Sequence, residues 1–177
     1  MRISVFIVLM LCLSAGTTAS VEVPEARNLA ELGERAKQDK LPILLMVSQD
    51  GCSFCEKLKE EILEPMLISG DYTDRVIISE LMMDSYGNIT GFEGESVHPS
   101  DVATQYRVWV TPTILFLDAK GREVQARMLG VNTIEMYGYY LDESIAGAIR
   151  AIRDEDALPY VPSNEDLGIK DLTNSAM

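Results

Sequence analysis

The chain changes character at Ser48-Gln49-Asp50-Gly51-Cys52-Ser53-Phe54-Cys55. An apolar run over residues 41–47 ends here, and a charged segment with helical spacing begins at Glu56. The pattern predicts a buried strand followed directly by a helix, with both sulfurs on the first helical turn. A helix N-terminus carries partial positive charge and unpaired N–H groups, which favour a thiolate over a thiol. Sulfurs at this spacing can also form a disulfide, so the stretch is typical of a dithiol/disulfide switch.

The first residues have the pattern of a secretory signal peptide. Arg2 supplies a positive charge, residues 5–13 are apolar, and small residues follow as far as Ala19. The apolar run is too short to span a bilayer, which argues against a membrane anchor. We therefore expect a signal peptide over residues 1–19 and export of the remaining chain to the periplasm.

Cysteine usage favours a redox role for Cys52 and Cys55. Cleavage after Ala19 would remove Cys12, and the loss of Arg2 would change the formal charge from −13 to −14. A disulfide across so short a loop stabilises a fold little, because it removes little entropy from the unfolded chain. A four-thiolate zinc site is excluded, since the chain has no second cysteine pair. The acidic balance argues against nucleic acid and anionic membranes as partners.

Length and composition indicate one folded domain. The chain has 177 residues, 47% hydrophobic and 24% charged, which is enough to bury a sizeable core. Beyond Asp154 the sequence becomes polar and contains prolines. We expect a domain over residues 20–158 and a loosely packed C-terminal tail over residues 159–177.

Hydrophobic periodicity predicts elements in the order α β α β α β β α. The first helix, 29–39, begins with a capping-box pattern at Asn28 and Glu31. Pro65 should kink or end the second helix, because proline removes an internal hydrogen bond. The elements after the first helix are expected over residues 42–47, 53–67, 76–82, 99–106, 113–117, 122–129 and 139–153.

A long irregular stretch, 84–98, separates the second strand from the third helix. Loops of this length in a compact domain are usually functional or mobile. The chain's single histidine, His98, ends the stretch and precedes Pro99. We interpret His98 as a surface or capping residue rather than a ligand or a base.

A second chemical feature is Val110-Thr111-Pro112-Thr113, just before a predicted strand. Together with the upstream cysteines, it makes the chain similar to the thioredoxin superfamily over about residues 28–153. The other matching segments are Ala103-Thr104-Gln105-Tyr106-Arg107-Val108, Ile114 to Val124, and Gly130. The resemblance implies an α/β, thioredoxin-like fold: a central mixed β-sheet flanked by helices, with an inserted loop before the third helix. Among exported members, the chain resembles SoxW-type proteins and the periplasmic C-terminal domain of the DsbD transporter.

The resemblance implies a role for each residue of the site. Cys52 would attack a substrate disulfide, and Cys55 would resolve the mixed disulfide, leaving the two joined as a redox-active disulfide. Pro112 would be the family's cis-proline, and Thr111 would offer backbone hydrogen bonds to an extended substrate. Phe54 would be an apolar neighbour of the sulfurs that contacts the substrate. No metal and no cofactor are implied.

Two positions depart from the family's pattern. Gly51 stands where the family usually has tryptophan, and Met46 stands where many members carry a buried acid that assists the resolving cysteine. The dipeptide between the cysteines also lacks a histidine that would stabilise a thiolate. We therefore predict a moderately reducing, monomeric thiol–disulfide oxidoreductase. Its partners would be disulfide- or thiol-bearing exported proteins and a membrane electron donor of the DsbD/CcdA type.

Copper binding is an alternative function from a different class. Cys52, Cys55 and His98 could bind Cu(I) as in exported metallochaperones with a thioredoxin-like fold, because thiolates are soft ligands. Those chaperones typically space their cysteines more widely, whereas the spacing here suits a disulfide. A redox-inert binding module is a third reading, against which the presence of both cysteines argues.

Overall fold

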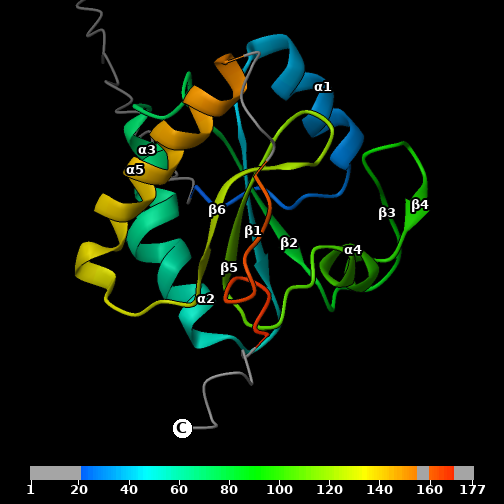
Figure 1. The fold of residues 1–177 in the computed structure, drawn as a ribbon. Coiled ribbons are helices and arrows are strands. Elements are labelled where there is room, and N and C mark those ends of the chain that lie inside the picture. Colours follow the sequence, from blue (N-terminus) through cyan, green and yellow to red (C-terminus); the bar gives the residue numbers. More distant parts are fainter. Residues whose placement is uncertain (1–20, 155–159, 170–177) are drawn as a thin grey trace, which may run out of the picture.

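The computed structural model describes residues 21–154 and 160–169 (Figure 1). The predicted signal peptide, residues 1–19, lies outside the described residues. None of the helices in the described ranges is both long enough and apolar enough to cross a membrane.

A mixed four-stranded sheet forms the centre of the fold, with strand order β2-β1-β5-β6. The strands are β1 (Ile43–Ser48), β2 (Ile77–Met82), β5 (Thr113–Leu117) and β6 (Glu123–Leu129). β1 pairs in parallel with β2 and antiparallel with β5, and β5 pairs antiparallel with β6. Every residue of β1 and β5 is buried, as expected for apolar strands in the middle of a covered sheet. The predicted α/β fold with a central mixed sheet is confirmed.

Helices cover both faces of this sheet (Figure 1). One face carries α2 (Ser53–Leu58), the π-helical turn η1 (Lys59–Leu63), α3 (Glu64–Ser69) and α5 (Ile134–Arg153). The other face carries α1 (Leu29–Asp39) and α4 (Pro99–Gln105). Side chains alternate along a strand, so β1 contributes Leu44 and Met46 to the first core and Leu45 and Val47 to the second.

The capping pattern at the first helix is confirmed. Asn28 is the N-cap of α1, and its Oδ1 accepts a hydrogen bond from the N–H of Glu31 at 3.1 Å. The Asn28 side-chain amide in turn donates to Glu31 Oε2 at 3.3 Å. These two bonds fix the start of the helix where the sequence predicts it.

Pro65 does not end the helix that follows the cysteines. The helix continues through α3 to Ser69, and the backbone widens into η1 just before the proline. The N–H of Glu64 bonds to the carbonyl of Lys59, five residues back. A proline has no N–H to donate and its ring crowds the preceding turn, so a wider turn at this point accommodates it without a break.

Two further elements differ from the sequence expectation. The stretch 84–98 contains a small hairpin of β3 (Ile89–Thr90) and β4 (Ser96–Val97), whose strands are too short to show a period. α5 begins at Ile134 rather than at residue 139. Gly138, a poor helix former, separates the first turns from the rest of the helix and weakens the helical signal there.

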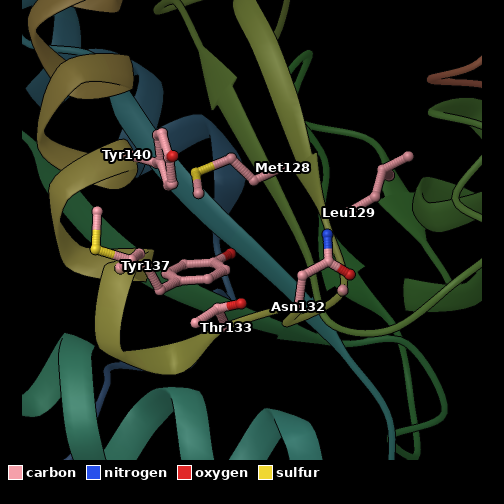
Figure 2. Close-up of a pocket in the computed structure, with 8 residues that line it drawn as sticks. Met128, Leu129, Asn132, Thr133, Tyr137 and Tyr140 are labelled. Carbon is pink, nitrogen blue, oxygen red and sulfur yellow. The ribbon is translucent and has the colours of Figure 1, made fainter.

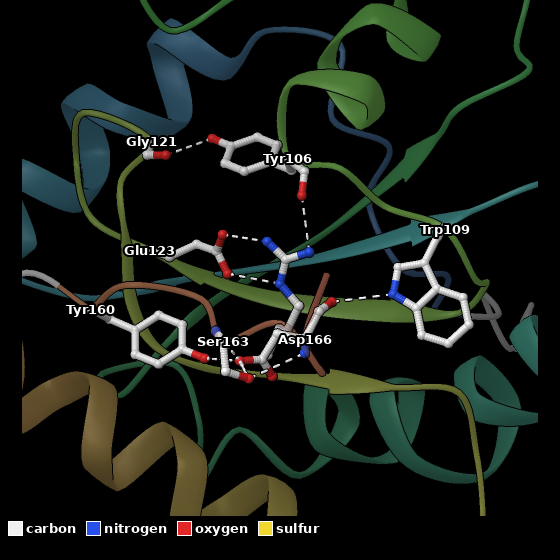
Figure 3. A network of polar contacts seen from close by, with 8 residues as sticks. Tyr106, Trp109, Gly121, Glu123, Tyr160, Ser163 and Asp166 are labelled. Carbon is white, nitrogen blue, oxygen red and sulfur yellow. Dashed lines mark hydrogen bonds and ion pairs between the residues drawn. The ribbon is translucent and has the colours of Figure 1, made fainter. Parts of the chain in front are cut away.

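Residues 160–169 contact the folded domain, which their polar composition does not predict. The carbonyl of Asp166 accepts a hydrogen bond from Trp109 Nε1 at 3.2 Å, and its Oδ2 accepts one from the Tyr160 hydroxyl at 2.6 Å (Figure 3). The Ser163 N–H also donates to Asp166 Oδ2, at 2.7 Å. This part of the expected loose tail is therefore held by specific contacts.

Candidate active site

Cys52 and Cys55 form a disulfide at the start of α2. Cys52 is the N-cap residue, and its sulfur accepts a hydrogen bond from the N–H of Cys55 at 3.2 Å. Cys52 is partly exposed, whereas Cys55 is fully buried. The two sulfurs therefore differ in access, and an incoming disulfide can reach only that of Cys52.

The turn before the disulfide is anchored by the 84–98 stretch. The N–H of Asp50 donates to the two carboxylate oxygens of Asp84, at 3.1 and 3.0 Å. Gly51 follows with a φ of 67°, a left-handed conformation that only glycine adopts without cost. A larger residue at position 51 would be strained here, which explains the departure from the family's tryptophan.

Pro112 lies at the same end of the sheet as the disulfide. Thr113 pairs with Val47, so Pro112 stands beside Ser48, the last residue of β1. The Thr111–Pro112 peptide bond is cis, as the resemblance implies. Pro112 is buried and Thr111 is partly exposed. The fold thus brings both residues to the sheet end from which the chain turns into the disulfide loop.

Two exposed aromatic side chains are close in sequence to residues of the site, one to the cysteines and the other to Pro112. Phe54, between the cysteines, is 57% exposed, and Trp109, three residues before Pro112, is 56% exposed. Large exposed aromatic side chains are typical of binding surfaces. Trp109 was not among the site residues predicted from the sequence. Its position two residues before Thr111 was the signal that could have identified it.

A buried polar cluster lies between β2 and the helix that carries the disulfide. Glu80 is 6% exposed, and its Oε1 accepts a hydrogen bond from the Ser48 hydroxyl at 2.6 Å. Lys59 Nζ lies 3.3 Å from each carboxylate oxygen of Glu80 and 2.9 Å from Glu56. Burial disfavours the charge on Lys59, but the contacts with Glu56 and Glu80 outweigh it and raise the pKa of Lys59. Lys59 is one helical turn beyond Cys55, so the cluster lies directly below the disulfide helix.

Glu80 is the functional candidate that sequence reasoning missed. It pairs in register with Met46, and both side chains point to the sheet face covered by α2. The carboxylate that the family places at position 46 is therefore absent from β1, and another stands on the neighbouring strand. The signal was a single charged residue inside the otherwise apolar segment 76–82.

His98 is not part of this site. Its Nδ1 accepts a hydrogen bond from the Ser100 N–H at 3.3 Å and lies 2.8 Å from the Ser100 hydroxyl, so it caps α4 as the sequence predicts. Within residues 21–154 and 160–169, no three His, Cys, Asp or Glu side chains are grouped so that they could hold a metal ion. The copper alternative requires His98 next to both cysteines, and the geometry gives it no support.

Known proteins show the same architecture. Residues 29–145 match the family described as the thioredoxin-like domain. The structure is similar to that of DsbH oxidoreductase, with a TM-score of 0.53, 22% identity, and coverage of 78% of this chain and 92% of that chain. It is also similar to the structure of thioredoxin O2 from Arabidopsis thaliana in the oxidised state, with a TM-score of 0.47, 18% identity, and coverage of 69% of this chain and 93% of that chain. At these identities the likeness shows the fold alone. No curated protein sequence matches the chain.

Proposed function

The chain belongs to the thioredoxin-like domain family and, with its Cys52–Cys55 disulfide, is a thiol–disulfide oxidoreductase; from this premise we propose that it reduces disulfides of exported proteins in the periplasm. The similarity to the thioredoxin superfamily inferred from the sequence is confirmed. The compartment, the direction of electron flow and the partners are the proposed part. One observation carries the direction: the turn that leads into Cys52 contains Asp50 and is bonded to Asp84, and the lysines nearest the cysteines, Lys57 and Lys59, are paired with carboxylates.

Reduction of a substrate begins at the accessible cysteine. In the dithiol form, the Cys52 thiolate attacks one sulfur of a substrate disulfide, and the other substrate sulfur leaves as a thiolate. The Cys55 thiolate then attacks the Cys52 sulfur, and the second substrate sulfur leaves. The substrate gains two electrons, and the protein retains the Cys52–Cys55 disulfide. The partial exposure of Cys52 and the burial of Cys55 support this order.

The charges near the sulfurs support a reductant. Asp50 lies two residues before Cys52, and Asp84 is bonded to the Asp50 N–H. Glu56 directly follows Cys55, and its charge is paired with Lys59 at 2.9 Å. Negative charges close to a sulfur disfavour its thiolate. Lys57, the nearest cation in the sequence, is paired with Glu61 at 3.9 Å. A reduced form that gains little stability as a thiolate gives up its electrons readily.

Turnover requires an electron source. Each cycle leaves the protein oxidised, so a dithiol donor must return two electrons to the Cys52–Cys55 disulfide. We propose a membrane donor of the DsbD/CcdA type, which fits the signal-peptide pattern of residues 1–19. The protein would act on its substrates as a monomer.

The equilibrium of Cys52–Cys55 with glutathione tests the direction. We expect a reduction potential near that of thioredoxin, about −270 mV, because the lysines closest to the cysteines are paired with carboxylates and do little to stabilise the thiolate. A potential near about −120 mV, as in a strong periplasmic oxidant, would overturn the proposal. Cys55→Ser should accumulate mixed disulfides with exported proteins, and Cys52→Ser, the matched control, should accumulate none.

A further inference from the structure

A pocket of about 330 Å³ opens between the end of β6 and the first turns of α5. Figure 2 shows Met128 from β6 facing Tyr137 and Tyr140 from α5. The volume is at the lower end of the range for small-ligand pockets, roughly 300–1,000 Å³. The pocket is therefore large enough for one side chain or a small group rather than for a large cofactor.

The pocket adjoins the part of the redox site that holds Pro112. Gly130 lines the pocket, and its N–H donates to the carbonyl of Pro112 at 2.8 Å. Leu129, also in the lining, pairs with Thr113 across β5 and β6. A Cβ atom at Gly130 would meet no other atom within 4 Å, so the space above this backbone is open. An extended chain passing Thr111 and Pro112 would reach the pocket directly.

The lining determines what kind of group would fit. None of the residues that line the pocket is charged, and its rim is formed by two unusually exposed apolar side chains, Met136 at 46% and Tyr140 at 56%. Methionine adapts its shape to different apolar partners, and tyrosine provides a rigid contact surface. Tyr137, 5% exposed, closes the inner side. This lining suits a neutral, apolar group that arrives from solvent.

We infer that the pocket binds an apolar side chain of the substrate polypeptide and so selects among substrate disulfides. This inference rests on the proposed function. Alternate side chains of an extended segment share one face, so the bound side chain lies two residues from the cysteine that meets Cys52. Substrates with leucine, methionine or an aromatic residue at that position are preferred over substrates with a polar residue.

The test compares two disulfide peptides that differ only in leucine or serine two residues from the cysteine, on either side. The wild-type protein should reduce the leucine peptide with about tenfold higher kcat/KM, the discrimination that an apolar pocket provides. Tyr140→Gln should lose most of this preference. Tyr86→Gln is the matched control, because Tyr86 is 96% exposed and does not line the pocket. It should keep the preference.

A small disulfide, hydroxyethyl disulfide, separates the two claims. It has no side chain for the pocket, so the wild-type protein and both tyrosine variants should reduce it at equal rates. Equal rates for the two peptides with normal reduction of the small disulfide would overturn the inference and leave the proposed function standing. Equal loss of preference in Tyr86→Gln and Tyr140→Gln would also overturn it. If no disulfide is reduced at all, the proposed function fails and the inference fails with it.

Discussion

At the scale of single residues, Glu80 shows how a buried carboxyl group below the disulfide helix is matched by its neighbours. Its two oxygens are matched by the Ser48 hydroxyl and Lys59 Nζ, so the buried charge is paired and hydrogen-bonded. An unpaired buried charge would be far more costly than this arrangement. The three side chains depend on one another, and removing Glu80 should leave Ser48 and Lys59 each with one hydrogen-bond or ion-pair partner fewer.

Glu80→Gln should lower the free energy of unfolding by about 1–3 kcal/mol, because the largely buried Lys59 loses one of its two acidic partners. Urea unfolding at neutral pH measures the change. Glu61→Gln is the control: its ion pair with Lys57 is exposed and 3.9 Å long, so its loss should cost less than about 0.5 kcal/mol. Equal effects of the two changes would contradict the role assigned to Glu80.

The partly buried Tyr106 and the buried Tyr137 should respond in opposite ways to loss of the hydroxyl. The Tyr106 hydroxyl donates to the Gly121 carbonyl at 2.6 Å, so Tyr106→Phe should cost about 1 kcal/mol. The Tyr137 hydroxyl is buried without a partner in the described part of the chain, so Tyr137→Phe should be neutral or stabilising by up to about 1 kcal/mol. Urea unfolding of both variants at neutral pH distinguishes the signs, and destabilisation of similar size in both would contradict the argument.

The same tyrosines give stability a pH dependence. Burial raises the pKa of Tyr137, and burial with the nearby Glu123 and Asp118 raises the pKa of Tyr106. The unfolded chain therefore releases these protons first as the pH rises. The free energy of unfolding that the two tyrosines contribute is fully present below about pH 10, the pKa of tyrosine in the unfolded chain, and is lost progressively as the pH rises above it. Unfolding free energies measured up to about pH 11 should fall less steeply for Tyr137→Phe than for the wild type.

At the scale of elements, the sequence predicts best where a segment has one dominant pattern. Residues 43–47 are apolar without interruption, and the structure places them in the central strand β1. The early start of α5 was missed because Gly138 weakens the helical signal, and the hairpin in 84–98 was missed because two-residue strands carry no period. The cysteine pair and Pro112 could be placed from their neighbours in the sequence. Glu80 could not, because its importance comes from pairing between β2 and β1 and from Lys59 above it.

The link between the 84–98 stretch and the disulfide turn gives a prediction at this scale. Asp84→Ala removes both the anchor of the Asp50 N–H and a negative charge near the disulfide. The thiolate form of the reduced cysteines should then be more stable. The reduction potential of Cys52–Cys55, measured in equilibrium with glutathione, should therefore rise by roughly 20 mV. Glu93→Ala is the control, because Glu93 lies with Asp118 and Ala119 at the opposite end of the sheet. A shift of the same size in both variants would contradict a local effect.

At the scale of the whole molecule, the C-terminal segment 160–169 is tied to the loop that leads to Pro112. The buried Arg127 of β6 pairs with Glu123 of the same strand and donates to the carbonyl of Tyr106, just before this loop, at 2.9 Å. Figure 3 shows Tyr106 and Glu123 close to the segment that holds Asp166. Asp166 and Trp109 join the segment to the same side of the domain. Polar contacts therefore connect the end of the chain to the edge of the redox site.

Gly168 is the position that tests this connection. It has a φ of 66°, and a Cβ atom there would lie 2.7–2.8 Å from the Trp109 ring, closer than real contacts allow. Gly168→Val should therefore push the segment off the indole. Trp109 is the only tryptophan in the chain, so its fluorescence reports the change directly. We expect a red-shifted emission and faster quenching by acrylamide in Gly168→Val. Glu165→Ala should leave both unchanged, because the Glu165 side chain is exposed. An unaltered spectrum in Gly168→Val would mean that the segment does not rest on Trp109 in solution.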